Sequence, residues 1–378
     1  MKKLAIIHYM PLEYYPPVTN MLDRISEIDS LKTSVWSTHN TKQRAVYKNN
    51  KLSRILRSTF PNQNQNKVIR LITYFWFTIR VFIGLVLFNP KTICYYETYS
   101  VGPVYFYMRL FGKNKSLIIH YHEYFDQDWY NKGMLLVRYY YSLEKKWLLK
   151  KASWISHTNS FRRNLFIQDH PQLASEKVQV MPNYPPDEWS DYSRENIQLD
   201  LEPNILKIVY VGSLSLEDTY IEDFCTWVIA NKEHVVFDIF SYNCKGSAAE
   251  YLNNLGAENI NFFHKGIEYF DLPRLLSKYD IGIILYKGNS LNAKYCASNK
   301  LFEYLALGLE VWVSKEQLGT KPYLNDKTIP RVISCDYNNL DIDIIDSFKS
   351  SRTLPEESSK YKFSSASNEF VYFIQNLT

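Results

Sequence analysis

The amino-acid sequence predicts an α/β protein made of two Rossmann-like domains. In both halves of the chain, short apolar runs bounded by turn residues alternate with helical patterns. Alternation of this kind is typical of parallel strands joined by crossover helices. A polar stretch with several prolines, Pro182–Pro203, separates the two halves and is typical of a linker region. The length of 378 residues also suits two hydrophobic cores better than one.

Residues 1–190 are expected to form the N-terminal domain. The apolar runs predict strands at Leu4–His8, Thr92–Tyr96, Ser116–His120 and Trp154–Thr158. The helical patterns predict helices at Thr19–Ile28, Pro103–Leu110 and Gly133–Lys151. Crossover helices between successive strands would place these strands parallel to one another in a single sheet.

The segment Val68–Phe88 is almost entirely apolar and approaches the length of a membrane span. Arg70 and Arg80 interrupt it, and Arg80 would lie near the middle of a bilayer. The sequence therefore favours a buried or half-buried helix over a span. A helix lying at a membrane surface is the intermediate reading.

Residues 191–203 are expected to form the linker, and residues 204–355 the C-terminal domain. The predicted strands are Leu206–Val211, Val235–Phe240, Ile260–Phe263, Ile281–Leu285 and Val311–Ser314. The predicted helices are Ile221–Asn231, Ala248–Leu255, Leu272–Lys278 and Ser298–Gly308. The last segment, residues 356–378, contains an amphipathic helix at Asn368–Leu377, and packing back on the N-terminal domain is one option for it. Because doubly wound sheets bind ligands beyond the carboxyl ends of their strands, a site is expected in the cleft between the domains.

The net charge of +5 conceals an asymmetry between the two halves. Residues 1–200 contain 27 Lys and Arg against 16 Asp and Glu, whereas residues 201–378 contain 17 against 23. From Ser30 to Tyr96 there are eleven basic residues and no acidic residue. The basic half is therefore expected to face an anionic partner, and an anionic membrane surface or a lipid-linked acceptor is preferred to nucleic acid because the sequence has no nucleic-acid-binding motif.

The sequence predicts neither disulfides nor a metal site. The five cysteines show no paired spacing, which fits a reducing cytoplasm. The apolar run that follows Met1 is too short for a signal peptide. Asp341-Ile342-Asp343 matches a D-x-D metal motif, but its alternating acids are more typical of a solvated surface. His120-Tyr121-His122-Glu123 lacks a second cluster of ligands.

The stretch Ser298–Gly308, with the sequence SNKLFEYLALG, predicts a short helix with a binding function. Ser298 or Asn299 suits the N-cap, and Gly308 suits the position just beyond the helix end. The positive end of the helix, with Lys300 beside it, suits a diphosphate. Glu303 lies one turn further and suits a pair of sugar hydroxyls. The same two residues could instead form a solvated pair that benefits only from the helix dipole.

This helix resembles the nucleotide-binding helix of family-4-type bacterial glycosyltransferases, which have the GT-B fold of two Rossmann-like domains facing across a cleft. Further stretches resemble motifs of that family in the same order, namely Tyr121–Glu123, Val180–Asn183, Tyr210–Leu214, His264–Gly266, Leu272–Leu276 and Tyr279–Ile283. The resemblance extends from Leu4 to Ser314 and so covers most of the chain.

The resemblance implies that the C-terminal domain binds a UDP- or GDP-linked sugar and that the N-terminal domain binds the acceptor. Lys300 would then contact the diphosphate, Glu303 would bind the ribose, and the backbone at Gly212 and Ser213 would approach the phosphates. The other residues assigned to the donor site are Lys294, Tyr295 and Asn299. The residues assigned to catalysis are His122 and Glu123. The resemblance implies no metal and no cofactor, because the nucleotide sugar is the substrate.

The sequence departs from the family at several of these positions. Tyr295 stands where the family has the first glutamate of its E-x7-E motif, and Glu310 stands where it prefers proline. The turn after Gly212 lacks the usual Arg and Lys, for which Lys294 and Arg274 are candidate replacements.

The sequence as a whole predicts a cytoplasmic glycosyltransferase, with peripheral attachment to the inner face of the plasma membrane as an option. It would move a sugar to a lipid-linked or polysaccharide acceptor during capsule, O-antigen or exopolysaccharide synthesis, with retention of configuration and without a metal. The alternatives are a nucleotide-sugar epimerase of similar architecture and a catalytically silent GT-B-like scaffold that binds glycan.

Overall fold

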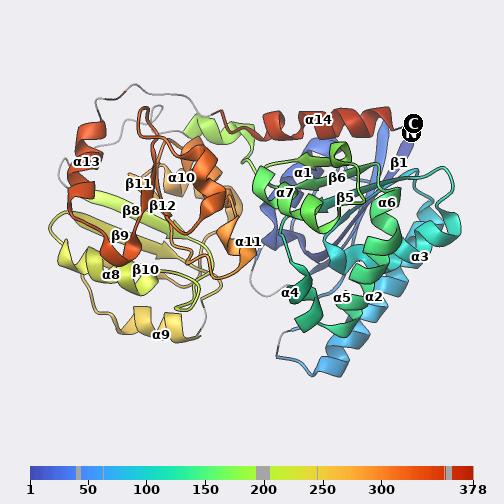
Figure 1. Ribbon diagram of the computed structural model, residues 1–378, viewed down its shortest axis with the longest axis horizontal. Helices are drawn as coiled ribbons and strands as arrows, with labels where there is room; N and C mark the ends of the chain where they lie inside the picture. Colours follow the sequence, from blue (N-terminus) through green and yellow to red (C-terminus); the bar gives the residue numbers. More distant parts are fainter. Residues whose placement is uncertain are drawn as a thin grey trace. The chain divides into compact units, whose positions relative to one another are not determined.

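The structure is a computed structural model that describes residues 1–39, 44–62, 64–192, 205–244, 246–352, 354 and 360–377. Its secondary structure is shown in Figure 1. The chain divides into two compact units: unit 1 contains Met1–Pro182 and Ala366–Thr378, and unit 2 contains Asn183–Ser365.

The first unit ends at Pro182, before the boundary expected at residue 190. Two aromatic side chains explain this difference, because both belong to the core of unit 2. The ring of Tyr184 lies 4.6 Å from that of Phe302, and the buried Trp189 lies 5.0 Å from Tyr269. Most of the expected linker, residues 193–203, lies outside the described residues.

In the described part of the chain, unit 1 has a seven-stranded sheet in the order β3-β2-β1-β4-β5-β6-β7. The strands are β1 Lys2–Pro11, β2 Leu31–His39, β3 Arg54–Thr59, β4 Thr92–Tyr96, β5 Ser116–Tyr121, β6 Trp154–His157 and β7 Val178–Val180. All neighbouring strands pair in parallel. Their carboxyl ends therefore meet at one edge, where the strand order reverses between β1 and β4, and such a switch point is a common place for a ligand.

The helices that pack in unit 1 are α1 Pro16–Ser26, α2 Lys67–Phe88, α3 Val101–Phe111, α4 Gln127–Lys132, α5 Leu135–Leu143, α6 Leu149–Lys151, α7 Ser160–Asp169 and α14 Phe363–Asn376. A π-helical turn, Glu144–Leu148, joins α5 to α6. The C-terminal helix α14 is fixed to unit 1 by Phe370, whose ring lies 5.6 Å from that of Trp154.

Helix α2 coincides with the apolar segment expected to be half-buried. Its inward residues, which include Tyr74, Phe77 and Val81, share one core with the strand residues Ala5 and Ile7. Gly84 allows close packing, because a Cβ atom there would lie 2.9 Å from Cε2 of Trp36 on β2. Among the described residues, α2 is the one helix with the length and composition of a membrane span.

Unit 2 has, within the described residues, a six-stranded sheet in the order β10-β9-β8-β11-β12-β13. The strands are β8 Leu206–Val211, β9 Val235–Phe240, β10 Ile260–Phe263, β11 Ile281–Ile284, β12 Glu310–Ser314 and β13 Val332–Cys335, and all neighbours are parallel. The helices are α8 Ile221–Ala230, α9 Gly246–Asn254, α10 Leu272–Leu276, α11 Leu291–Lys294, α12 Asn299–Ala306 and α13 Asp343–Ser351. The switch point of this sheet lies between β8 and β11.

Several elements were not expected from the sequence. These are the strands β2, β3, β7 and β13 and the helices α4, α7, α11 and α13. Among the elements that were expected, most boundaries differ by one to five residues, as is usual at frayed or capped ends.

Candidate functional site

Helix α12 begins and ends at the residues expected from its sequence. Ser298 is the N-cap, and its hydroxyl accepts a hydrogen bond from the backbone N–H of Lys300 at 3.3 Å. Gly308, at φ +76°, follows the C-cap Leu307 in the left-handed conformation that glycine adopts readily. The helix therefore has a defined N-terminus, and the positive end of the helix dipole is a favourable place for an anion.

Tyr304 fixes α12 to the centre of the sheet. Its hydroxyl accepts a hydrogen bond from the backbone N–H of Val211 at 3.2 Å. Its ring fits against β11 because residue 282 is glycine, where a Cβ atom would lie 2.7 Å from Cδ1 of Tyr304. The first turn of α12 is thus held close to the carboxyl end of β8, next to the switch point.

Lys300 lies over the turn that follows β8. A Cβ atom at Gly212 would lie 2.7 Å from Nζ of Lys300, and the φ of Gly212 is +144°. Nζ donates a hydrogen bond to the hydroxyl of Tyr286 at 2.9 Å and lies 5.8 Å from the ring centre of Tyr210. The two tyrosines hold the ammonium group in place and contact it through oxygen and ring electrons.

Lys300 retains its positive charge in this setting. Burial by itself lowers the pKa of Lys300, but the oxygens of Tyr286 and Tyr210 and the carboxyl of Glu303 raise it, and the net shift is upward. A fixed cation at a helix N-terminus, over a backbone turn that lacks a side chain, can bind a phosphate group closely.

Glu303 is a buried carboxyl one turn along the same helix, and 8% of its surface is exposed. Burial raises its pKa to about 7, and the nearby Lys300 acts in the opposite direction. Once ionised, this carboxyl offers two acceptor oxygens to sugar hydroxyls.

The other predicted donor-site residues are Ser213, Asn299, Lys294 and Tyr295, and their surroundings differ from those of Lys300. Ser213 is exposed, and its hydroxyl accepts a hydrogen bond from the Asn243 side chain at 3.4 Å. Asn299 is the first residue of α12 and is half-buried. Lys294 and Tyr295 are half-buried at the end of α11, and Lys294 forms no ion pair with another described residue.

Tyr286 is the residue of this site that the sequence did not predict. It lies two residues beyond the end of β11, so its position at the carboxyl edge of the sheet was the available signal. Tyr210 belongs to the recognised Tyr210–Leu214 turn, but only the structure shows its ring beneath Lys300.

In unit 1, His122 and Glu123 lie just beyond the carboxyl end of β5. The ring of His122 is buried and stacks on Tyr96 at 5.3 Å, and it also meets the rings of His8 and His120 at 6.4 Å and 4.6 Å. Glu123 is half-buried. The two predicted residues therefore lie next to the switch point between β1 and β4.

Glu97 holds the turn that carries His122 and Glu123, and sequence reasoning missed it. Its carboxylate accepts hydrogen bonds from the backbone N–H groups of His122 at 2.6 Å and Glu123 at 3.3 Å. Its own backbone has a φ of +59°, which is unfavourable for a residue with a side chain. Arg162 donates a hydrogen bond to the carbonyl oxygen of His122 at 2.5 Å and so holds the same turn. The turn is a fixed, preorganised element.

The imidazoles of His8 and His120, beside this turn, are neutral. Burial lowers the pKa of His8 to about 4 and that of His120 to about 3. The pKa of Glu97 shifts in the opposite direction: burial and the nearby Glu123 raise it to about 8. The hydrogen bonds from the backbone N–H groups of His122 and Glu123, and the charge of Arg162, limit this rise. Among the described residues, no three His, Cys, Asp or Glu side chains are placed to hold a metal ion.

Glu97 should make the stability of unit 1 depend on pH. Its folded-state pKa of about 8 lies above its ordinary value of 4.5, so the folded chain binds the proton more tightly. The stabilisation is full below about pH 4.5 and is lost as the pH rises through about 8. Glu97→Gln cannot titrate, so its free energy of unfolding should fall less over that range, as measured by chemical denaturation. The exposed Glu176→Gln is the control, and identical slopes for Glu97→Gln and the wild type would contradict this role.

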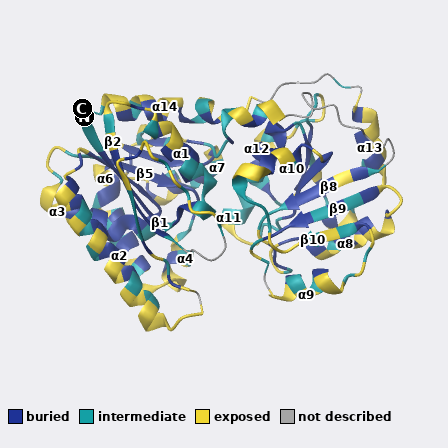
Figure 2. Ribbon diagram, turned by 180° about the vertical axis from the view of Figure 1, so that it is seen from behind, coloured by how far each residue is buried: buried dark blue, intermediate teal, exposed yellow. Residues whose placement is uncertain are grey.

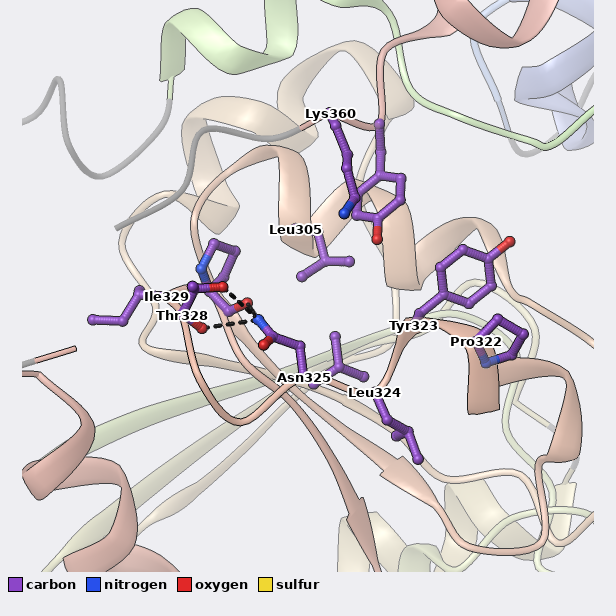
Figure 3. Close-up of a pocket in the computed structure, with 11 residues that line it drawn as sticks. Leu305, Pro322, Tyr323, Leu324, Asn325, Thr328, Ile329 and Lys360 are labelled. Atoms are coloured by element: carbon purple, nitrogen blue, oxygen red, sulfur yellow. Dashed lines mark hydrogen bonds between the residues drawn. The ribbon is translucent and has the colours of Figure 1, made fainter. Parts of the chain in front are cut away.

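A pocket of about 260 Å³ lies elsewhere in unit 2 (Figure 3). Leu305 of α12, Tyr323 and Lys360 line it, and the Asn325 side chain donates a hydrogen bond to the Thr328 hydroxyl at 2.8 Å. Because Leu305 is five residues beyond Lys300, it lies about 7.5 Å further along the helix axis. The pocket contains none of the predicted donor-site residues.

Comparison with known proteins identifies the fold. No protein-family model and no curated protein sequence matches the chain. The solved structure of sucrose-phosphate synthase from Thermosynechococcus elongatus is 13% identical, with a TM-score of 0.67 over 100% of this chain and 99% of that one. The lipopolysaccharide outer core galactosyltransferase WaaB is 11% identical, with a TM-score of 0.61 over 99% of both chains. UDP-GlcNAc 2-epimerase from Neisseria meningitidis is 13% identical, with a TM-score of 0.62 over 99% of this chain and 100% of that one. Together with the two parallel sheets, these similarities confirm the predicted GT-B fold.

Proposed function

We propose that this protein is a family-4-type glycosyltransferase that uses a UDP- or GDP-linked sugar as its donor. The observation that carries the proposal is the position of Lys300, whose ammonium group lies against Gly212 at the N-terminus of α12. This arrangement offers a fixed positive charge and the positive end of a helix to a diphosphate. The solved structures of similar fold include enzymes named for galactosyl transfer and for UDP-sugar conversion, which supports a nucleotide-sugar ligand.

The proposed chemistry follows from the charge that develops when the sugar leaves. As the bond between the anomeric carbon and the diphosphate breaks, negative charge grows on the phosphate oxygens. Lys300 and the N-terminus of α12 would stabilise that charge without rearrangement, because Tyr286 and Tyr210 already hold the ammonium group. This stabilisation requires no metal, and we propose a metal-independent reaction with retention of configuration.

Unit 1 would bind the acceptor, and His122 and Glu123 would face the reacting hydroxyl. The preorganised turn held by Glu97 and Arg162 supports this role, because a catalytic group must be positioned before the reaction. We propose a lipid-linked or polysaccharide acceptor in surface-glycan assembly on the cytoplasmic face of the membrane. The galactosyltransferase named for the lipopolysaccharide outer core supports this class of acceptor.

A nucleotide-sugar epimerase is the second candidate function, because UDP-GlcNAc 2-epimerases have the same fold. The test is a panel of UDP- and GDP-sugars, incubated with and without glycan acceptors, with product analysis by mass spectrometry. A transferase releases nucleotide diphosphate and extends an acceptor. An epimerase converts the sugar with no acceptor present, and that result would overturn the proposal. Binding of no nucleotide at all would favour a silent scaffold.

Donor affinity should depend on pH through Glu303. Its pKa of about 7 means that raising the pH from about 6 to about 8 ionises the carboxyl and provides two acceptor oxygens for the ribose. We therefore expect tighter binding of the nucleotide at the higher pH, measured by calorimetry. Glu303→Gln should bind more weakly and with little pH dependence, while its melting temperature stays near that of the wild type. A wild-type affinity that does not change with pH would contradict the role of Glu303.

A further inference from the structure

Helix α2 is apolar on the side that faces away from unit 1 as well as on the side that faces its core. The outward residues include Ile72, Phe75, Trp76, Ile83 and Leu87, and between 50% and 80% of each is exposed. Their spacing is helical, and they alternate with the inward residues of the same helix. Figure 2 shows α2 with exposed residues along its outer side. A soluble protein rarely exposes so many large apolar side chains on one helix.

The exposed apolar surface continues onto two neighbouring helices. Tyr107 of α3 donates a hydrogen bond to Asn89, the C-cap of α2, at 3.3 Å, so the ends of the two helices lie together. On α3, the exposed large apolar residues are Phe106, Leu110 and Phe111. On α5, Tyr140 contacts the ring of Tyr74 of α2 at 6.0 Å, and the exposed residues nearby are Leu135 and Tyr139. We call this combined surface of α2, α3 and α5 the apolar face.

The charges on these three helices all have the same sign. The sequences of α2, α3 and α5 contain no Asp or Glu. Their basic residues are Lys67, Arg70, Arg80, Arg109 and Arg138. An apolar surface on helices whose charged residues are all cationic is complementary to a layer of anionic lipid headgroups over acyl chains.

We propose that the apolar face binds to the surface of an anionic phospholipid membrane, with α2 lying in the plane of the membrane. Insertion of Trp76, Phe75 and Leu87 would remove their exposed surface from water, and the arginines would contact lipid phosphates. A span is disfavoured because Tyr74, Phe77 and Val81 of the same helix are part of the core of unit 1, and a span would have to remove them. This proposal does not depend on the proposed transferase activity.

The experiment is flotation of the full-length protein with vesicles of two compositions. One is phosphatidylcholine alone, and the other contains about one part in three phosphatidylglycerol. We expect binding to the anionic vesicles and its loss as salt is raised from about 0.1 M to about 1 M, because high salt screens the arginines. Trp76→Glu with Leu87→Glu should lower the bound fraction at least about 10-fold, because two carboxylates would enter the lipid interface. Arg80→Gln with Arg138→Gln should lower it several-fold on anionic vesicles.

The matched control is Phe270→Glu in unit 2, where 71% of the side chain is exposed and no change in vesicle binding is expected. Circular dichroism establishes that each variant is folded, and Leu87→Glu alone provides the test if the double variant is not. Equal vesicle binding by wild type and the Trp76/Leu87 variant would overturn the proposal, as would equal binding to both vesicle compositions. Resistance to alkaline carbonate would indicate a span. A solution dimer that the same substitutions dissociate, without vesicle binding, would identify a second copy of the chain as the occupant.

Discussion

Lys300→Met should weaken the binding of UDP or GDP about 10- to 150-fold. The ammonium group lies at the N-terminus of α12 against Gly212, and hydrogen bonds to charged groups contribute about 1.5 to 3 kcal/mol each. Methionine has nearly the same length and occupies the same space between Tyr210 and Tyr286, so the packing is retained while the charge is lost. The melting temperature should therefore change little.

Calorimetric titration with UDP or GDP measures the loss of affinity caused by Lys300→Met. Lys232→Met is the matched control, because Lys232 is exposed and lies between α8 and β9, at the opposite edge of the same sheet. Tyr286→Phe separates the effect of the Lys300 charge from the effect of its orientation. The variant keeps the ammonium group but removes the hydroxyl that orients it, so we expect a smaller loss of affinity than for Lys300→Met. An unchanged dissociation constant for Lys300→Met would remove the basis of the proposed function.

The sequence predicted the local structure around Lys300 in unit 2 because the signals there are local. The N-cap Ser298, the terminal Gly308 and the turn glycine at position 212 each act within a few residues of the chain, and the structure shows Ser298 and Gly308 in the expected positions. The contact between Lys300 and Gly212 joins two such local elements. Their proximity was predictable because both follow from the carboxyl edge of a parallel sheet.

The parts that were missed depend on contacts between distant residues. Strand β2 was not expected because it is rich in hydroxyl side chains, and only the fold shows that Ser37 donates a hydrogen bond to the carbonyl oxygen of Met10 at 2.9 Å. Glu97 is a single acid after a strand in the sequence, but in the structure its carboxylate binds the turn at His122, which is 25 residues further along the chain. Pattern and propensity do not contain such pairings.

Glu310 is a departure from the family pattern that the structure explains. Its carboxylate forms an ion pair with Arg331, with Nε to Oε2 at 2.7 Å, and it accepts a second hydrogen bond from the indole N–H of Trp312 at 2.7 Å. The side chains of Glu310 and Arg331 are only 4% and 7% exposed. The residue at the start of β12 therefore stabilises the pairing of β12 with β13.

Glu310→Gln should destabilise unit 2 by about 3 to 5 kcal/mol, because it leaves the guanidinium of Arg331 buried without a counter-charge. For a unit of this size, such a loss lowers the melting temperature by about 10 °C. Scanning calorimetry measures the change. Lys315→Met, which breaks the more exposed pair with Asp336 in the same unit, is the control and should lower the melting temperature much less.

Arg331→Met should behave differently, because the group left behind can take up a proton. Burial already raises the pKa of Glu310 while Arg331 holds it down, so removal of Arg331 raises that pKa further. In the folded variant, Glu310 then keeps its proton at pH values where Glu310 of the unfolded chain has already lost it. The free energy of unfolding of the variant therefore falls as the pH rises through the folded-state pKa of Glu310. Glu310→Gln has no such titration, so its loss of stability should not depend on pH in this way.

The double variant Glu310→Gln with Arg331→Met should recover most of the wild-type stability, because glutamine still accepts a hydrogen bond from Trp312 and no buried charge remains. Two single losses that simply add in the double variant would show that the pair is not the source of the stability.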